Sequence, residues 1–373
     1  MTSTMQNLDT RQEKLSQALK DHGLDAIALN PGPSLVYLTG LHFHLSERPV
    51  VGMFAANQAP VLVLPELEAA KLTGLPYDLD ATTYGEDPYT WPGQFAEALE
   101  SLPGGKVGVE DLSMRLLEYR MLQSALPGAE FADAGELIAG LRMFKDDQEV
   151  ADMQKAAQIA EAALSTTLPQ IKIGMTEKQV AGILVQELLK NGSLSELPFQ
   201  PIVSTGPNGA NPHAFPSERQ LSSGDLLVID FGANWNGYLS DITRTFAVGE
   251  FSPEQERVHN TVLAANQAGR DTAAPGISCG EVDAAARAVI EAAGYGEYFI
   301  HRTGHGLGMQ AHEEPYIRGG NPLALEPGMT FTIEPGIYLP DRFGVRIEDN
   351  VLITPERLRS LTTFPRELQV IRS

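Results

Sequence analysis

Acidic side chains interrupt apolar, strand-like runs in the C-terminal part of the sequence, and this feature limits the fold more than any other. The run "DLLVIDFGA" contains Asp230, and "YLSDITRTF" contains Asp241 after the turn signal "NWNG". The turn predicts that the second run returns beside the first, with the two carboxylates facing each other. A buried pair of carboxylates requires a cation or a shared proton, because the charges repel each other. Two aspartates at a solvated edge are the alternative.

A second pair of acids follows the same pattern near the C-terminus. The stretch "FTIEPGIYLPDRFGVRIEDNVLIT" reads as one hairpin of two apolar runs, with Glu334 in the first run and Glu348 in the second. Period-2 alternation buries both carboxylates or directs them into a cavity, and Arg346 is the obvious local cation. The fold must therefore bring further positive charge to these acids.

Three of the eight histidines, His301, His305 and His312, stand close together in "HRTGHGLGMQAHEEP". The glycines let the backbone approach a ligand closely, and clustered imidazoles are typical of metal or acid/base sites. Together with the four acids, one such histidine suits a pair of divalent cations, because these ions favour mainly oxygen ligands. Ligand chemistry favours manganese, with cobalt or zinc as alternatives.

Two helix-like segments in the C-terminal part resemble each other. "GMTEKQVAGILVQELLKNG" (174–192) and "GISCGEVDAAARAVIEAAG" (276–294) share their pattern of glycine, capping hydroxyl and amphipathic helix. Their capping boxes are Thr176 with Gln179 and Ser278 with Glu281. Either two ordinary capped helices look alike, or an α+β half is duplicated, with a site formed between the halves.

The N-terminal part has a different organisation. Short apolar runs alternate with candidate helices and predict a mixed α/β domain over 1–135, without a recognisable catalytic motif. We expect a linker over 136–146 and a second domain over 147–373. The long helix that opens this second domain starts at "DDQEVADMQ", with Asp146 as N-cap and Glu149 at N3.

The composition excludes several classes of protein. The 373 residues include 27 Lys+Arg and 48 Asp+Glu, and a net charge of −21 repels nucleic acid. The lone Cys279 forms no internal disulfide and no cysteine zinc knuckle. No run approaches the length of a transmembrane helix, and the first residues lack the apolar core of a secretion signal. We therefore expect a cytoplasmic protein that binds neither nucleic acid nor membrane.

The five candidate ligands resemble the signature of proline-specific metallopeptidases, the prolidase and aminopeptidase P family. They are Asp230 and Asp241 in "DFGANWNGYLSDITRT", His305 in "TGHGLG", Glu334 in "IEPGIY" and Glu348 in "VRIED". The segments "GLRMFKDDQEVADMQKAAQIA" and "LVYLTGL" also resemble the family. The resemblance implies an α+β pita-bread catalytic domain with pseudo-twofold halves, preceded by a smaller mixed α/β domain of the creatinase type.

The resemblance also implies the role of each ligand. Asp230 binds one metal ion, His305 and Glu334 bind mainly the other, and Asp241 and Glu348 bridge the two. A hydroxide between the ions is then the nucleophile, and Glu334 accepts its proton.

Four further residues correspond to family positions at the substrate. His213 and His312 resemble catalytic histidines that contact the substrate, and His301 lines the pocket for the proline ring. Arg346 orients a carboxylate and limits the negative charge of the site.

The implied reaction is hydrolysis of Xaa-Pro bonds in di- or oligopeptides by a homodimer. A prolidase, which is an Xaa-Pro dipeptidase, is the leading interpretation, and an aminopeptidase P acting on longer peptides is the alternative. Arg302, Arg318 and Arg342 are candidates for binding a dipeptide carboxylate. Trp235 stands where relatives often have tyrosine, so a role of that hydroxyl does not carry over. Metal-free hydrolases and binding proteins of this fold are expected to lack ligands that this chain retains.

Overall fold

The computed structural model describes residues 8–372, and the chain divides into two compact units between Arg142 and Met143. Most of the segment predicted as the linker lies in helix α5 (Gly135–Met143). Within residues 8–372, no helix is long and apolar enough to cross a membrane.

The N-terminal unit is a mixed six-stranded sheet with helices, as the alternation of runs predicts. The strand order is β4-β3-β2-β1-β5-β6, with β1 antiparallel to β2 and parallel to β5. The strands are β1 (Ala26–Leu29), β2 (Val51–Ala55), β3 (Val61–Pro65), β4 (Asp80–Tyr84), β5 (Lys106–Val109) and β6 (Glu130–Asp133). The helices besides α5 are α1 (Leu8–Asp21), α2 (Pro33–Thr39), α3 (Trp91–Leu99), α4 (Leu116–Ala125) and the 3-10 helix η2 (Glu66–Leu72).

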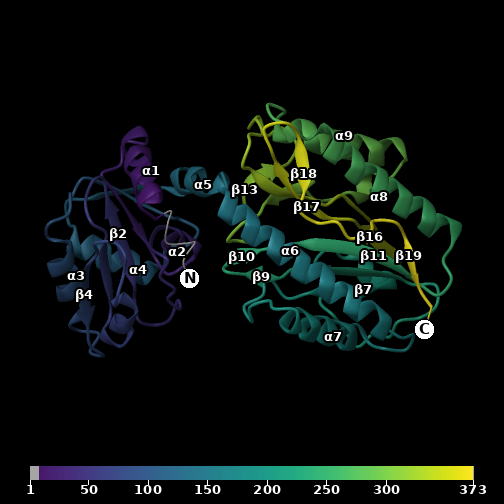
Figure 1. The fold of residues 1–373 in the computed structure, drawn as a ribbon, viewed down its shortest axis with the longest axis horizontal. Helices are drawn as coiled ribbons and strands as arrows, with labels where there is room; N and C mark the ends of the chain where they lie inside the picture. The colour runs from purple at the N-terminus through teal and green to yellow at the C-terminus, as the bar shows by residue number, and fades with distance from the viewer. Residues whose placement is uncertain (1–7, 373) are drawn as a thin grey trace. The chain divides into compact units, whose positions relative to one another are not determined.

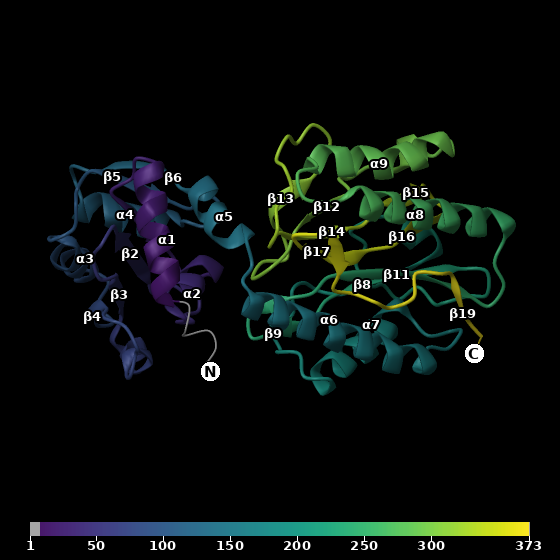
Figure 2. The same cartoon turned by 45° about the horizontal axis from the view of Figure 1, so that its top comes forward.

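The C-terminal unit places two sheets between two pairs of helices (Figures 1 and 2). One sheet has the order β19-β11-β8-β7 and the other β13-β12-β14-β17-β18. The first contains β7 (Ile202–Thr205), β8 (Leu226–Phe231), β11 (Ile242–Val248) and β19 (Gln369–Ile371). The second contains β12 (Gly304–Gly306), β13 (Glu313–Ile317), β14 (Thr330–Ile333), β17 (Asp349–Ile353) and β18 (Leu358–Ser360).

The helices and short hairpins complete this unit. Figure 2 shows α6 (Asp147–Thr167) and α7 (Glu177–Lys190) on one side of the sheets, and α8 (Pro253–Thr272) and α9 (Cys279–Ala292) on the other. Two-stranded hairpins pair β9 (Asn234–Trp235) with β10 (Tyr238–Leu239), and β15 (Gly336–Leu339) with β16 (Phe343–Arg346). Three 3-10 helices are η3 (Leu168–Gln170), η4 (Gly206–Ala210) and η5 (Gly296–Tyr298).

The two similar helices occupy matching places in the two halves. Both capping boxes form, at Thr176 of α7 and at Ser278 of α9. The amide of Gly174 donates to Leu221, and the amide of Gly276 donates to Leu325, each over 2.8 Å. Each helix therefore starts beside an equivalent extended segment, which supports the interpretation of a duplicated α+β half.

Candidate functional site

Asp230 and Asp241 come from neighbouring strands, but they are not directly opposite each other. Asp230, at the end of β8, pairs with Thr243 of β11, so Asp241 lies two residues further along the same face. Between the two aspartates the chain forms the β9–β10 hairpin, which keeps the register of β8–β11 and has Asn236 and Gly237 at positive φ in its turn. The predicted face-to-face pairing is therefore wrong by two residues, although both carboxylates share one face.

Glu334 and Glu348 lie where one long hairpin passes from the second sheet to the β15–β16 pair. Ile333 pairs with Asp349 in β14–β17, and Gly336 pairs with Arg346 in β15–β16, so one register runs through both ladders. This register places Glu334 opposite Glu348 at the break. The predicted single hairpin is thus interrupted, and both glutamates are at the interruption.

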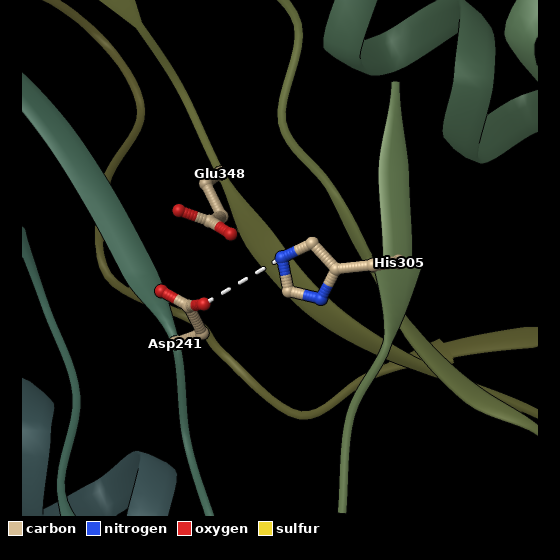
Figure 3. A group of neighbouring side chains, drawn as sticks. All are labelled: Asp241, His305 and Glu348. Carbon is tan, nitrogen blue, oxygen red and sulfur yellow. Dashed lines mark ion pairs between the residues drawn. The ribbon is translucent and has the colours of Figure 1, made fainter. Parts of the chain in front are cut away.

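His305 joins these acids from the middle of β12. Its Nε2 lies 3.2 Å from Oε1 of Glu334 and 3.8 Å from Oδ2 of Asp241. Ligand atoms of Asp241, His305 and Glu348 all lie within 4.8 Å of one another (Figure 3). His305 in β12 and the residues directly before β11 and β17 therefore bring their side chains to one point, from two different sheets.

The charges of this cluster require a cation. Burial, followed by the neighbouring carboxylates, raises the pKa of Asp241 and Glu348 well above the ordinary range. Burial also raises the pKa of Asp230. Burial acts in the same direction on Glu334, but the hydrogen bond and charge of His305 outweigh it and lower the pKa of Glu334 to about 2. Acids of this kind are stable as carboxylates only when positive charge lies among them.

Two oxygen atoms identify where that charge would be bound. Oδ1 of Asp230 and Oδ1 of Asp241 are buried and have no hydrogen-bond partner among the described residues. A divalent ion would satisfy both acceptors, and carboxylates with one imidazole are a suitable ligand set. The residues present therefore fit a metal centre.

Arg346 supplies the fixed positive charge beside this centre. Its guanidinium forms an ion pair with Asp230 and donates to the Tyr338 hydroxyl over 2.7 Å. That hydroxyl lies 2.9 Å from Nε2 of His301. Sequence reasoning missed Tyr338, because a tyrosine in "PGIYLP" is an ordinary strand residue. The chain of contacts from Asp230 to His301 depends on pairing that the sequence does not display.

Two further side chains orient the ligands and were also missed. Thr243 donates to Oε2 of Glu348 over 2.6 Å. Asn350 accepts the backbone N–H of Asp241 over 2.9 Å and donates to the carbonyl of the same residue. Thr243 is two residues after Asp241, so strand alternation was a signal that could have identified it. Asn350 had no such signal.

The remaining predicted histidines lie around the cluster. The rings of His312 and His305 stand 4.0 Å apart between centroids. Partial burial, then the charges of His305 and Arg302, lower the pKa of His312 to about 4. His213 is exposed on the loop after η4, and its charge contributes to the lowered pKa of both His301 and His312. The structure thus brings all nine predicted site residues to one region of the C-terminal unit.

Comparisons with known proteins agree with this geometry. Residues 151–355 match the model of metallopeptidase family M24, and residues 11–144 match the creatinase/prolidase N-terminal domain. The chain is 34% identical to an Xaa-Pro dipeptidase of Lactobacillus delbrueckii subsp. lactis, with 96% of this chain and 98% of that protein covered.

Solved structures share the whole fold. A recombinant prolidase from Thermococcus sibiricus has a TM-score of 0.90 and 35% identity, covering 97% of this chain and 98% of that one. An X-Pro aminopeptidase from Thermotoga maritima has a TM-score of 0.85 and 31% identity, covering 96% and 99%. The expected fold class, a pita-bread domain after a creatinase-type domain, is confirmed. The chain belongs to metallopeptidase family M24, and this membership implies a divalent metal ion.

Proposed function

We propose that this chain is an Xaa-Pro dipeptidase that depends on two divalent metal ions. The observation that carries the proposal is the buried group of Asp241, His305 and Glu348, together with one oxygen each of Asp230 and Asp241 that lacks a hydrogen-bond partner among the described residues. The full-length similarity to proteins named Xaa-Pro dipeptidase and prolidase supports it.

In this proposal the ions are held by Asp230, Asp241, His305, Glu334 and Glu348. Manganese is the first choice, with cobalt or zinc as alternatives, because the ligand set is mainly oxygen. Bound ions would supply an activated water and polarise the scissile carbonyl. Thr243 and Asn350 would keep Glu348 and Asp241 oriented for this purpose through the hydrogen bonds described above.

The protein's own groups would handle the protons and the substrate. Glu334 is ionised at neutral pH, so it can accept a proton from the attacking water and pass it to the leaving proline nitrogen. A His312 with a pKa of about 4 is a neutral imidazole at pH 7 and can donate one N–H to the developing oxyanion. We assign His213 to contact with the substrate and His301 to the wall of the pocket for the proline ring. Arg346 holds Asp230 in place through their ion pair.

Proline explains why a dedicated enzyme is useful. Its peptide nitrogen carries no N–H and its φ is fixed, so peptidases that bind an extended backbone through that donor accommodate it poorly.

A dipeptidase must also bind the carboxylate of the proline, and Arg302 is our candidate. Its guanidinium lies 4.3 Å from the ring centroid of Tyr316, beside His312. Of the other two candidates, Arg342 is exposed and paired with Glu254, and Arg318 is exposed and donates to the carbonyl of Gly319. A half-buried guanidinium held by stacking is better suited to binding a carboxylate.

The remaining parts of the proposal concern the assembly. We propose a homodimer with an N-terminal domain over 1–135, a linker over 136–146 and a catalytic domain over 147–373. We place it in the cytoplasm, because a single cysteine suits a reducing compartment. Peptides are the proposed partners, rather than nucleic acid or membrane, and the net charge of −21 supports the exclusion of nucleic acid.

The alternative is an Xaa-Pro aminopeptidase, which the similarity to the Thermotoga maritima structure supports. Manganese-loaded protein should be assayed with Ala-Pro, Ala-Pro-amide and Ala-Pro-Ala. We expect rapid cleavage of Ala-Pro alone, because the other two lack a carboxylate on the proline. Preferred cleavage of Ala-Pro-Ala would establish the alternative. No turnover of any of the three, with manganese bound, would refute both peptidase assignments.

A further inference from the structure

We propose that Glu177 is the positioning residue for the His213 loop, defined as residues 206–217. Glu177 lies on the first turn of α7 and belongs neither to the metal centre nor to the substrate contacts described above. The inference rests on the proposed function to the extent that His213 contacts the substrate.

The carboxylate of Glu177 joins the two ends of this loop. Its Oε1 accepts the backbone N–H of Thr205 over 2.7 Å and the Thr205 hydroxyl over 3.2 Å. Its Oε2 accepts the Asn208 amide over 2.7 Å, the backbone N–H of Ser217 over 2.9 Å and the Ser217 hydroxyl over 2.6 Å. One carboxylate therefore receives five hydrogen bonds, three from before His213 and two from after it.

Glu177 has no other evident task. Its side chain is fully buried, and among the described residues no lysine or arginine forms an ion pair with it. All five hydrogen bonds come from the His213 loop or from Thr205 immediately before it. A buried carboxylate is costly unless donors surround it, and here the loop supplies these donors. The loop and the carboxylate consequently fix each other.

The middle of the His213 loop contacts β16, the strand that carries Arg346. A Cβ at Gly344 of β16 would lie 2.0 Å from the carbonyl oxygen of Gly209, so only glycine permits this contact. Nη1 of Arg346 donates to the carbonyl of Pro212 over 3.3 Å, directly before His213. The part of the loop beyond these contacts is open, with Phe215 75% exposed. The Glu177 carboxylate thus binds both ends of the loop, with three hydrogen bonds before His213 and two after it.

The second half of the unit contains a corresponding arrangement. Asp283 of α9 is buried and accepts the backbone N–H of Thr303 over 3.1 Å and the Thr303 hydroxyl over 2.8 Å. Arg287, which is paired with Asp283, donates to the carbonyl of His301 over 2.9 Å. In each half, an acid on the capped helix therefore holds the segment that carries a site histidine.

Hydrogen exchange tests the anchor without any use of catalysis. In Glu177→Gln the side-chain volume is kept, but an NH₂ group faces backbone or side-chain donors. In the full-length, manganese-loaded protein, we expect the amides of Thr205 and Ser217 to exchange at least about tenfold faster than in wild type. Glu187→Gln is the matched control on the same helix, because that carboxylate bonds to Lys190 and Gln170. Unchanged exchange in Glu177→Gln would overturn the inference.

A double-mutant cycle tests whether Glu177 acts through His213. We expect Glu177→Gln to lower kcat/KM for Ala-Pro by roughly 10- to 100-fold in the wild-type background. In the His213→Ala background the same change should cost less than about threefold, because the group that it misplaces is already absent. Equal losses in both backgrounds would indicate a general structural role and refute the inference.

Two observations keep the outcomes separable. Glu177→Asp retains the charge with a shorter reach, so it should recover part of the lost activity if the glutamine variant folds poorly. Melting temperature and bound manganese should match wild type in every variant that is compared. If the wild-type protein cleaves no Xaa-Pro peptide, the proposed function fails, whereas the exchange measurement still decides whether Glu177 holds the loop.

Discussion

His259 provides a quantitative test of how burial affects the stability of the catalytic unit. The residue lies on α8 and is fully buried, and burial lowers the pKa of its imidazole to about 4. Glu367 acts to raise this pKa, and Arg244 acts to lower it. In the folded state the His259 imidazole therefore binds a proton only at a pH well below that at which it binds one in the unfolded chain. The perturbation we choose is His259→Leu, which removes the titrating group.

The magnitude follows from the two pKa values. A histidine in the unfolded chain has a pKa of about 6.5, so below that pH the unfolded state binds a proton that the folded state does not. The contribution of His259 to the free energy of unfolding of the wild type therefore falls as the pH drops from about 6.5 towards 4, and it stays constant below about pH 4. At pH 5 the loss from this one group is about 2 kcal/mol, and at pH 7 it is nearly zero. The leucine variant lacks this loss.

The assay is chemical denaturation of metal-free protein at pH 7 and pH 5. The chain has two tryptophans, Trp91 in the N-terminal unit and Trp235 in the catalytic unit, so a Trp91→Phe background reports only on the latter. All other titrating groups are common to both proteins and cancel in the difference. The free energy of unfolding of the variant, relative to wild type, should rise by about 2 kcal/mol between pH 7 and pH 5.

Val262→Ala is the control, because it removes buried volume from the same helix without removing a titrating group. It should lower stability by a similar amount at both pH values. A difference between wild type and His259→Leu that is independent of pH would refute the reasoning, because the buried imidazole would then titrate as in the unfolded chain.

Three further predictions concern the metal centre and its surroundings. Asp241→Ala should lose at least one bound manganese ion per chain after dialysis, as measured by elemental analysis, and retention of all metal would contradict its assignment as a ligand. Thr243→Val removes the hydrogen bond to Glu348 and should weaken manganese binding by roughly 10- to 100-fold in calorimetric titration, whereas unchanged affinity would show that the bond does not orient the ligand. Lys145→Met removes the buried ion pair between Lys145 and Glu313 and should lower the free energy of unfolding by about 3–5 kcal/mol in urea, most of which Lys145→Met with Glu313→Leu should restore.

Local features of this protein can be read from its sequence with little ambiguity. The capping boxes at Asp146, Thr176 and Ser278 all form, because each depends on residues only three apart. The turn at Asn236-Gly237 is also a local feature, because positive φ at both positions suits these residue types.

The points at which the strands are interrupted cannot be read in this way. Asp230 pairs with Thr243 rather than Asp241, because the β9–β10 hairpin keeps the register of β8–β11 and its turn at Asn236-Gly237 lies nearer to Asp241 than to Asp230. At Glu334 and Glu348 the register is also kept, but the chain passes there from one sheet to another, and no local preference indicates this change.

Residue types and their spacing thus identify the acids and histidines of the site and the need for a cation among them, because an unpaired carboxylate in an apolar run is costly wherever the chain takes it. Only the tertiary structure decides their partners. Arg346 reaches Asp230, Tyr338 reaches His301, and Glu177 reaches Ser217 through contacts between different elements. Such contacts arise from packing of the whole unit, and side-chain orientation in the site depends on them.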